Sequence, residues 1–221
     1  MGNDVKSALR FVIIILIGSF PCLAQGADRV DFASLSEVCA PSVHKDTMAA
    51  LVSVESSFNP FAIGVVHGRL SRQPKNMSEA LDVVRQLEEQ GMNYSLGLSQ
   101  VNKSNLPKYG LNAMKAFDPC KNLIAGSKIL SGCYDRAIRT GLDEQRAVRA
   151  ALSCYYSGNF TTGFKNGYVE AVVSRAGKTA NARTIRIIRT GGSAVGGATT
   201  KITEKSSPKE ARRESDPAFV F

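Results

Sequence analysis

Residues 47–60, with the sequence TMAALVSVESSFNP, are the stretch from which the fold of this chain can be worked out. Met48, Leu51 and Val52 recur at the spacing of one helical face, so the stretch begins as an amphipathic helix. The Asn-Pro pair that closes it marks the helix end, because the residue before a proline is pushed out of the α region. We therefore predict a helix over residues 43–56.

Glu55 extends the same apolar face by one turn, at the end of the predicted helix. Glutamate is seldom fully buried without a partner, and burial raises the pKa of a carboxyl group from about 4.3 by up to roughly 3–5 units. Such a group holds a proton near neutral pH and can donate it to a leaving group. Two interpretations remain open at this point: Glu55 is such an acid, or its side chain simply reaches water past Ser56.

Residues 1–24 are predicted to be a secretory signal peptide. Lys6 and Arg10 precede an apolar run at residues 11–20, and small residues follow this run. Cleavage is expected at the end of the segment or, as a second choice, after Gly26. The apolar run is too short to cross a bilayer, so we expect an exported protein with no stable membrane span after signal removal.

Four cysteines remain after removal of the signal peptide, and export places them in an oxidising compartment. An even number there predicts two disulfides, for which the sequence alone allows three pairings. We favour the pairing Cys39–Cys120 and Cys133–Cys154. The first bond would tie the start of the Glu55 helix to the next long helix, and the second would join the two helices that flank a turn near Gly141. The alternative to two disulfides is free buried thiols. The spacing of the cysteines matches no zinc site, so no metal is expected, and no cofactor is expected either.

The basic charge of the chain is concentrated in its C-terminal segment. Residues 178–221 carry nine basic and four acidic side chains, whereas residues 25–177 carry 17 and 14, a net charge of only +3. The C-terminal segment has few large apolar groups, so we expect a mostly disordered tail that can dock to a partner. Aromatic and basic residues are not interleaved as in a nucleic-acid platform, so no nucleic acid is expected as a ligand.

Residues 25–177 are predicted to form one mainly α-helical domain. Asp118 and Pro119 are typical of an N-cap and a first helical position, and they open the longest predicted helix. Strand signals are few, and a small β-hairpin is expected near residues 61–70 or 93–101. We predict six or seven helices, the clearest over residues 43–56, 78–91, 119–139, 144–156 and 166–176, with a lead-in at residues 27–42 and a brief strand at residues 184–189.

Four short segments carry a more specific signal when they are taken in their order along the chain. They are ESSFNP at residues 55–60, GLSQVN at 97–102, NLIAG at 122–126 and ALSCYYSG at 151–158. Together they resemble the lytic transglycosylases with the soluble-transglycosylase or goose-lysozyme-like fold, and in particular the members that serve type IV secretion and conjugation systems. Each motif alone is weak, but four in the right order and spacing behind a signal peptide are specific. The resemblance covers roughly residues 38–176.

This resemblance implies a lysozyme-like domain that acts in the periplasm on the glycan strands of peptidoglycan. Such enzymes cut the β-1,4 bond between N-acetylmuramic acid and N-acetylglucosamine without water and leave a 1,6-anhydromuramyl end. Glu55 matches the family's catalytic acid. Ordinary glycosidases need two catalytic carboxyl groups, whereas the sequence offers a single candidate. The match to a family with one catalytic acid agrees with that single candidate. The basic tail would dock to components of the secretion system, for which the enzyme would open the wall locally.

Supporting roles follow from the same resemblance, position by position. Ser99 and Gln100 would line the saccharide groove, and Gln100 would form a hydrogen bond to the substrate near the cleaved bond. Tyr155 matches a tyrosine whose hydroxyl lies near the catalytic carboxyl group. Asn122 would fix the loop around the groove, and Tyr168 would be a groove wall or a core residue.

The sequence also departs from the family pattern. Tyr156 stands where the family usually has asparagine, which removes that residue's hydrogen bond but offers a larger stacking surface. The predicted helix at residues 78–91 is extra, and would cover one end of the groove or dock a partner. Two other functions compete with lytic cleavage: a hydrolytic muramidase, which needs a placed water and usually a second carboxylate, and a non-catalytic peptidoglycan-binding scaffold.

Overall fold

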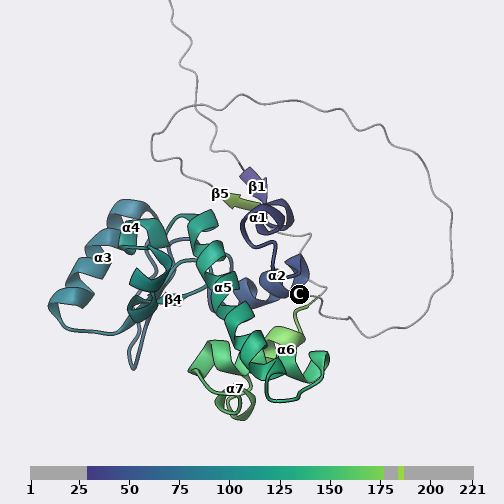
Figure 1. Cartoon of the computed structure of the whole chain (residues 1–221). Helices are drawn as coiled ribbons and strands as arrows, with labels where there is room; N and C mark the ends of the chain where they lie inside the picture. Colours follow the sequence, from purple (N-terminus) through teal and green to yellow (C-terminus); the bar gives the residue numbers. More distant parts are fainter. Residues whose placement is uncertain (1–28, 177–183, 187–221) are drawn as a thin grey trace, which may run out of the picture.

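The computed structural model describes residues 29–176 and 184–186, so the predicted signal peptide and most of the predicted tail lie outside the described residues. The described part is mainly helical, as predicted (Figure 1). Its α-helices are α1 (Phe32–Cys39), α2 (Lys45–Glu55), α3 (Met77–Glu89), α4 (Ala113–Ala116), α5 (Pro119–Ile138), α6 (Glu144–Ser157), α7 (Thr162–Lys165) and α8 (Tyr168–Val173). Its strands are β1 (Arg29–Asp31), β2 (Ile63–Val65), β3 (Tyr94–Leu96), β4 (Val101–Asn102) and β5 (Thr184–Arg186), and two 3-10 turns, η1 (Lys103–Asn105) and η2 (Pro107–Tyr109), follow β4.

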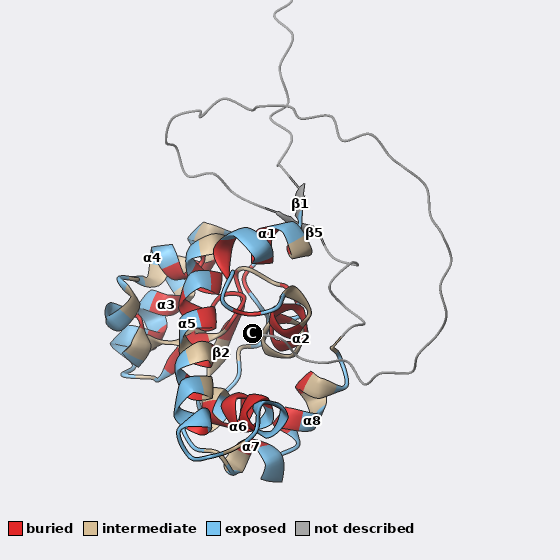
Figure 2. Cartoon of the chain, turned by 45° about the vertical axis from the view of Figure 1, so that its right-hand side comes forward, coloured by how far each residue is buried: buried red, intermediate tan, exposed pale blue. Residues whose placement is uncertain are grey.

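The longest helix, α5, occupies the middle of the molecule. Asp118 caps it by accepting a hydrogen bond from the backbone N–H of Lys121 at 2.9 Å, and Pro119 takes the first helical position, both as predicted. In Figures 1 and 2, α3 and α4 lie on one side of α5, while α6 and α7 lie by its C-terminal end. The helix therefore links the region of the small sheet to the last three helices.

Both segments proposed for a β-hairpin contribute to one sheet. Strand β2 comes from the first segment and pairs antiparallel with β3, which in turn pairs antiparallel with β4 from the second. Ile63 lies opposite Leu96, and Leu96 lies opposite Val101. The brief strand predicted near residue 184 is also present, as β5, and pairs antiparallel with β1.

Two predicted boundaries were wrong. The supposed lead-in contains helix α1, which Asp31 caps through its side chain and which buries Phe32, Leu35 and Cys39 on one face. Those three residues follow helical spacing, so the signal was present in the sequence. The last predicted helix is shorter than expected and follows a separate one-turn helix, α7, because Gly167 takes a left-handed conformation between α7 and α8.

The apolar residues form two main clusters. The larger one joins α1, α2, α5, α6 and α8, and it contains Met48, Leu51 and Val52, each 0% exposed, which confirms the helical face predicted for α2. The second cluster joins the sheet, α3 and the start of α5. Buried residues, red in Figure 2, accordingly lie along α2, α5 and α6.

Two disulfides connect α5 to its neighbours, in the favoured pairing. Cys39 at the end of α1 is bonded to Cys120 at the start of α5, with a Cα–Cα distance of 5.2 Å. Cys133 of α5 is bonded to Cys154 of α6, with a Cα–Cα distance of 5.8 Å. Among the described residues, none of the helices combines the length and apolar character that crossing a bilayer requires.

Candidate active site

Glu55 is the last residue of α2, and the backbone turns sharply just beyond it. Ser57 and Phe58 have φ angles of 50° and 63°, in the left-handed region that side chains other than glycine rarely adopt. Packing compensates for this strain: Phe58 is only 7% exposed, and its ring meets that of Phe32 edge-on at 5.0 Å. The turn therefore fixes where the helix ends and where the carboxyl group of Glu55 points.

The carboxyl group of Glu55 lies in an environment suited to proton transfer. Burial raises its pKa from 4.5 to about 7, and the hydroxyl of Tyr168, which donates a hydrogen bond to Oε1, partly opposes that rise. The side chain is thus neither free in water nor permanently neutral. The side chain is half-buried and lines a groove, so of the two interpretations that the sequence left open, this environment favours the acid that holds a proton near neutral pH.

Glu55 lines a groove of about 820 Å³. The groove runs between β2, the segment at residues 100–105 and helix α6, and it also includes Ile129 of α5. Of its lining residues that the structure describes, Glu55 is the only carboxylate. A mechanism with two carboxylic acids from the protein therefore has no second candidate among these lining residues.

Asn122 holds together the chain segments beside this groove through its buried amide. It is 0% exposed, and its side chain uses both polar atoms. Its Oδ1 accepts a hydrogen bond from the N–H of Ser99 at 2.7 Å, and its Nδ2 donates to the carbonyl oxygens of Leu96 and Ala116 at 2.9 and 2.7 Å. One buried amide therefore joins α5 to the sheet and to the end of α4.

Gln100 lines the groove, and its conformation is tightly held. Its φ of 46° is left-handed, and its Nε2 donates hydrogen bonds to the carbonyl oxygens of Ala62 and Gly97 at 3.1 and 2.9 Å. Gly64 makes room for the side chain, since a Cβ at that position would lie 2.5 Å from Oε1. With Nε2 occupied, Oε1 is the atom left to accept a hydrogen bond from a ligand.

Ser99 does not line the groove, contrary to the prediction. It is 0% exposed and packs against Gly126 of α5, where a Cβ would lie 2.5 Å from its side-chain atoms. Its carbonyl oxygen accepts a hydrogen bond from the hydroxyl of Tyr155 at 2.5 Å. Ser99 therefore joins two helices behind the groove, and a serine is small enough to fit between them.

Both tyrosines lie near Glu55, and Tyr168 is the one whose hydroxyl bonds to it. Tyr155 lines the groove near Glu55, and burial together with the charge of that carboxylate raises the pKa of Tyr155; its hydroxyl, however, is bonded to Ser99. Tyr168, expected as a wall or core residue, provides the hydroxyl that contacts Glu55. Sequence reasoning missed this contact because the two residues are 113 positions apart along the chain.

Tyr156 gives the groove an aromatic surface. Its ring stacks on that of Tyr168, with centroids 4.7 Å apart and an interplanar angle of 22°, and it remains 47% exposed. Its hydroxyl accepts a hydrogen bond from Nδ2 of Asn166 at 3.4 Å. The departure from the family pattern thus places a partly exposed ring beside the tyrosine that contacts Glu55.

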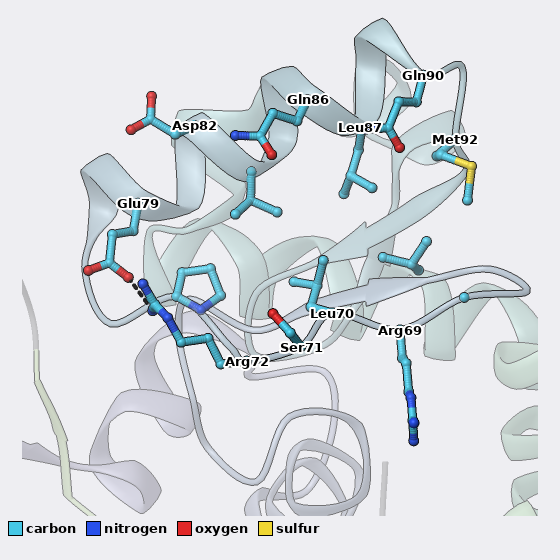
Figure 3. A pocket seen from close by; sticks show the side chains of 14 residues that line it. Arg69, Leu70, Ser71, Arg72, Glu79, Asp82, Gln86, Leu87, Gln90 and Met92 are labelled. Atoms are coloured by element: carbon cyan, nitrogen blue, oxygen red, sulfur yellow. Dashed lines mark hydrogen bonds and ion pairs between the residues drawn. The ribbon is translucent and has the colours of Figure 1, made fainter.

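A second groove, of about 480 Å³, lies between α3 and the segment at residues 65–74 (Figure 3). Leu70 and Leu87 face each other across it, and Arg72 forms an ion pair with Glu79 at 2.6 Å. Val65 lines both this groove and the Glu55 groove, so β2 borders both. The extra helix therefore borders a groove of its own.

Within the described residues, no group of three or more His, Cys, Asp or Glu side chains could hold a metal ion.

Comparisons with known proteins identify the family of the chain. The family model described as "Transglycosylase SLT domain" matches residues 33–175. The chain is 57% identical over 153 residues to "Type IV secretion system protein virB1" of Brucella suis biovar 1 (strain 1330), covering 66% of this chain and 64% of the relative. It is 37% identical over 169 residues to "Protein virB1" of Agrobacterium fabrum, covering 74% and 67%. The chain thus spans a little under two thirds of the Brucella relative. No solved structure matches the chain.

Proposed function

Because the chain belongs to the transglycosylase SLT domain family, we propose that it is a lytic transglycosylase that cleaves the β-1,4 bond between N-acetylmuramic acid and N-acetylglucosamine in peptidoglycan. The observation that carries this proposal is the Glu55 carboxyl group, whose pKa burial raises to about 7 and which is the only described carboxylate in its groove. A single acid that is partly protonated at neutral pH suits a reaction in which one group gives and then takes a proton.

In the first step Glu55 acts as a general acid. Its proton passes to the glycosidic oxygen as the bond from that oxygen to the muramyl C1 breaks, and the N-acetylglucosamine side leaves as an alcohol. Positive charge develops at C1, and Glu55 becomes a carboxylate. The hydroxyl of Tyr168 donates a hydrogen bond to that carboxylate and stabilises it.

In the second step the same carboxylate acts as a general base. It accepts the proton of the muramyl C6 hydroxyl while that oxygen forms a bond to C1, which closes the 1,6-anhydro ring. Glu55 is protonated again and no water is consumed. One carboxyl group is sufficient because the substrate supplies the nucleophile, whereas two-carboxylate glycosidases use a protein group or an activated water.

Two groove residues are suited to hold the sugar chain. Oε1 of Gln100 can accept a hydrogen bond from a sugar hydroxyl or acetamido N–H, since its Nε2 is already bonded to the backbone. The exposed part of the Tyr156 ring offers an apolar face on which a sugar ring can stack. These contacts would keep the cleaved bond near Glu55.

We further propose that the enzyme works in the periplasm and opens the wall locally for a type IV secretion apparatus. The name of the Brucella relative supports this context, as do the predicted signal peptide and the two disulfides. Residues 178–221, with a net charge of +5, would dock to a component of that apparatus.

The test is mass spectrometry of the soluble products released from purified peptidoglycan sacculi by the mature protein. Products with 1,6-anhydromuramyl ends, one water lighter than hydrolysed products, are expected. Reducing ends would instead identify a hydrolytic muramidase. Absence of release, with the protein still pelleting on the sacculi, would identify a binding scaffold. The variant Glu55→Gln should bind sacculi but release nothing; release at the parent rate would show that another residue is the acid.

A further inference from the structure

A third groove, of about 520 Å³, lies between η2, α5 and α6. Four of its lining residues are cationic: Lys108 of η2 and Lys128, Arg136 and Arg139 of α5 or its C-terminal end. None of the lining residues that the structure describes is Asp or Glu. Residues 25–177 carry 17 basic and 14 acidic side chains, so this one-sided gathering of charge is local. We name this site the cationic groove.

No ion pair within the described residues neutralises these four cations. Arg136 lies over the disulfide and donates to the sulfur of Cys133 at 3.3 Å, and the ammonium of Lys108 lies 5.5 Å from the ring centre of Tyr109. Neither contact supplies a negative charge. Unpaired like charges repel one another, so the gathering favours a ligand that brings anionic groups.

Gly132 lies between two of the cations on one face of α5. It follows Lys128 by four residues and precedes Arg136 by four, which places all three on one side of the helix. A glycine inside a helix costs about 1 kcal/mol relative to alanine, yet a Cβ at Gly132 would meet nothing within 4 Å, and its φ is not left-handed. Neither packing nor backbone conformation requires this glycine. Its effect is to leave the wall between the cations open.

The cationic groove adjoins the Glu55 groove. Asn105, Ile129 and Tyr155 line both. A ligand whose main chain lies beside Glu55 can therefore extend a branch past Tyr155 into the cationic groove. The α3 groove of Figure 3 differs in charge, because its rim carries both signs and Arg72 there is already paired with Glu79.

We propose that the cationic groove binds the carboxylates of the peptide that branches from the muramyl residues of peptidoglycan. This inference rests on the proposed function, since it takes the glycan strand to lie in the Glu55 groove. The unsubstituted peptide L-Ala-γ-D-Glu-diaminopimelate-D-Ala carries three carboxylates and one amine, so its charge is opposite to that of Lys108, Lys128, Arg136 and Arg139. Charge-assisted hydrogen bonds to these side chains would select glycan strands that still carry their peptides.

Binding of a soluble probe tests the proposal without catalysis. The probe is the N-acetylated tetrapeptide, compared with the same peptide amidated at its carboxyl groups, and calorimetry is done on Glu55→Gln so that turnover plays no part. The first variant adds Lys128→Gln and Arg139→Gln; the second adds Gly132→Leu, which fills the groove without touching the charges. The matched control adds Lys121→Gln and Arg149→Gln, which removes one lysine and one arginine from exposed positions of α5 and α6 outside the groove.

We expect both groove variants to bind the tetrapeptide at least about tenfold more weakly, equal to ~1.4 kcal/mol, with the matched control unchanged. The affinity should also fall as salt is raised, because partly exposed charges are screened. The proposal would be overturned if the protein failed to bind the tetrapeptide or bound its amidated form with equal affinity. It would also be overturned if the matched control lost as much affinity for the tetrapeptide as the groove variants. Charge-dependent binding confined to phosphatidylglycerol vesicles would overturn it too, and would make the cationic groove a lipid contact.

Cleavage then separates this inference from the proposed function. On an otherwise wild-type background, the groove variants should lose about tenfold in kcat/KM on peptide-bearing glycan strands, by the same conversion, and nothing on strands stripped of peptide by an amidase. An equal loss on both substrates would contradict peptide recognition. Absence of anhydromuramyl products from the wild type on either substrate would instead refute the proposed function, while the tetrapeptide titration would still decide the present inference.

Discussion

At the scale of single residues, two opposing influences set the proton affinity of Glu55. Burial raises the pKa of its carboxyl group to about 7, and the hydrogen bond from Tyr168 to the carboxylate lowers it. A general acid works best when its pKa lies near the working pH. Tyr168 is thus a positioning and tuning residue, whereas Glu55 is the group placed to meet the reacting atoms.

The variant Tyr168→Phe should move the alkaline limb of the pH–rate profile. Removing the hydroxyl removes a hydrogen bond that favours the carboxylate, so the pKa of Glu55 should rise above about 7. The acid then stays protonated to higher pH, and kcat/KM should begin to fall at a higher pH than in the wild type. Tyr156→Phe is the control, because its hydroxyl contacts Asn166 instead of Glu55. Superimposable profiles for Tyr168→Phe and the wild type would contradict this account.

The variant Glu55→Gln should be more stable than the wild type at alkaline pH. The folded-state pKa of about 7 lies above the ordinary 4.5, so the folded protein retains a proton that the unfolded chain has already lost between these values. Stability of the wild type therefore decreases as pH rises through this window, by about 3 kcal/mol in total. Urea unfolding at pH 4 and pH 8 measures the effect. A stability difference between variant and wild type that is the same at both pH values would refute it.

At the scale of secondary-structure elements, helix α5 contains two interior glycines with different environments. Gly126 is buried against Ser99, and a Cβ there would lie 2.5 Å from the side-chain atoms of that serine. Gly132 is exposed and has nothing within 4 Å of such a Cβ. The same residue type therefore allows close packing at one turn and open space at another.

Alanine substitutions at these two glycines should change stability in opposite directions. Gly126→Ala should lower the free energy of unfolding by about 1–3 kcal/mol, because Ser99 must shift. It should also lower activity, since Ser99 adjoins Gln100. Gly132→Ala should raise the free energy of unfolding by up to about 1 kcal/mol through helix propensity. Denaturant unfolding of both variants provides the measurement. A change in the free energy of unfolding that has the same sign in both variants would show that packing at Ser99 is looser than described.

The elements that could be predicted from sequence are those whose signals are local. Asp118 and Pro119 identified the start of α5, and the apolar spacing before Glu55 identified α2. The division of roles between Tyr155 and Tyr168 could not be predicted, because it depends on how α6 and α8 pack against α2. Burial of Ser99 was missed for the same reason.

At the scale of the whole molecule, the two disulfides attach α5 to α1 at one end and to α6 at the other. They close chain segments of different length, with sequence separations of 81 and 21 residues. A longer closed segment removes more conformational entropy from the unfolded chain. The link between α1 and α5 should therefore contribute more to global stability.

Replacing each cysteine pair with alanine tests this ranking. In the chain-entropy estimate, loss of Cys39–Cys120 costs about 4–5 kcal/mol and loss of Cys133–Cys154 about 3–4 kcal/mol. Denaturant unfolding of the two double variants gives the comparison. A larger loss for the shorter segment would show that packing around α6, including Arg136 over the disulfide, outweighs chain entropy.

The pairing of β1 with β5 has a mechanical consequence. Arg29 lies opposite Arg186, so the chain enters and leaves the described domain at the same end of a three-pair antiparallel ladder. A force that pulls the two flanking segments apart would open this ladder one pair at a time, like a zipper, instead of shearing all pairs together. The load would then reach α1, which the Cys39–Cys120 bond fastens to α5. If the two flanking segments were pulled apart, strands β1 and β5 would therefore separate before the force reached the turn that holds Glu55.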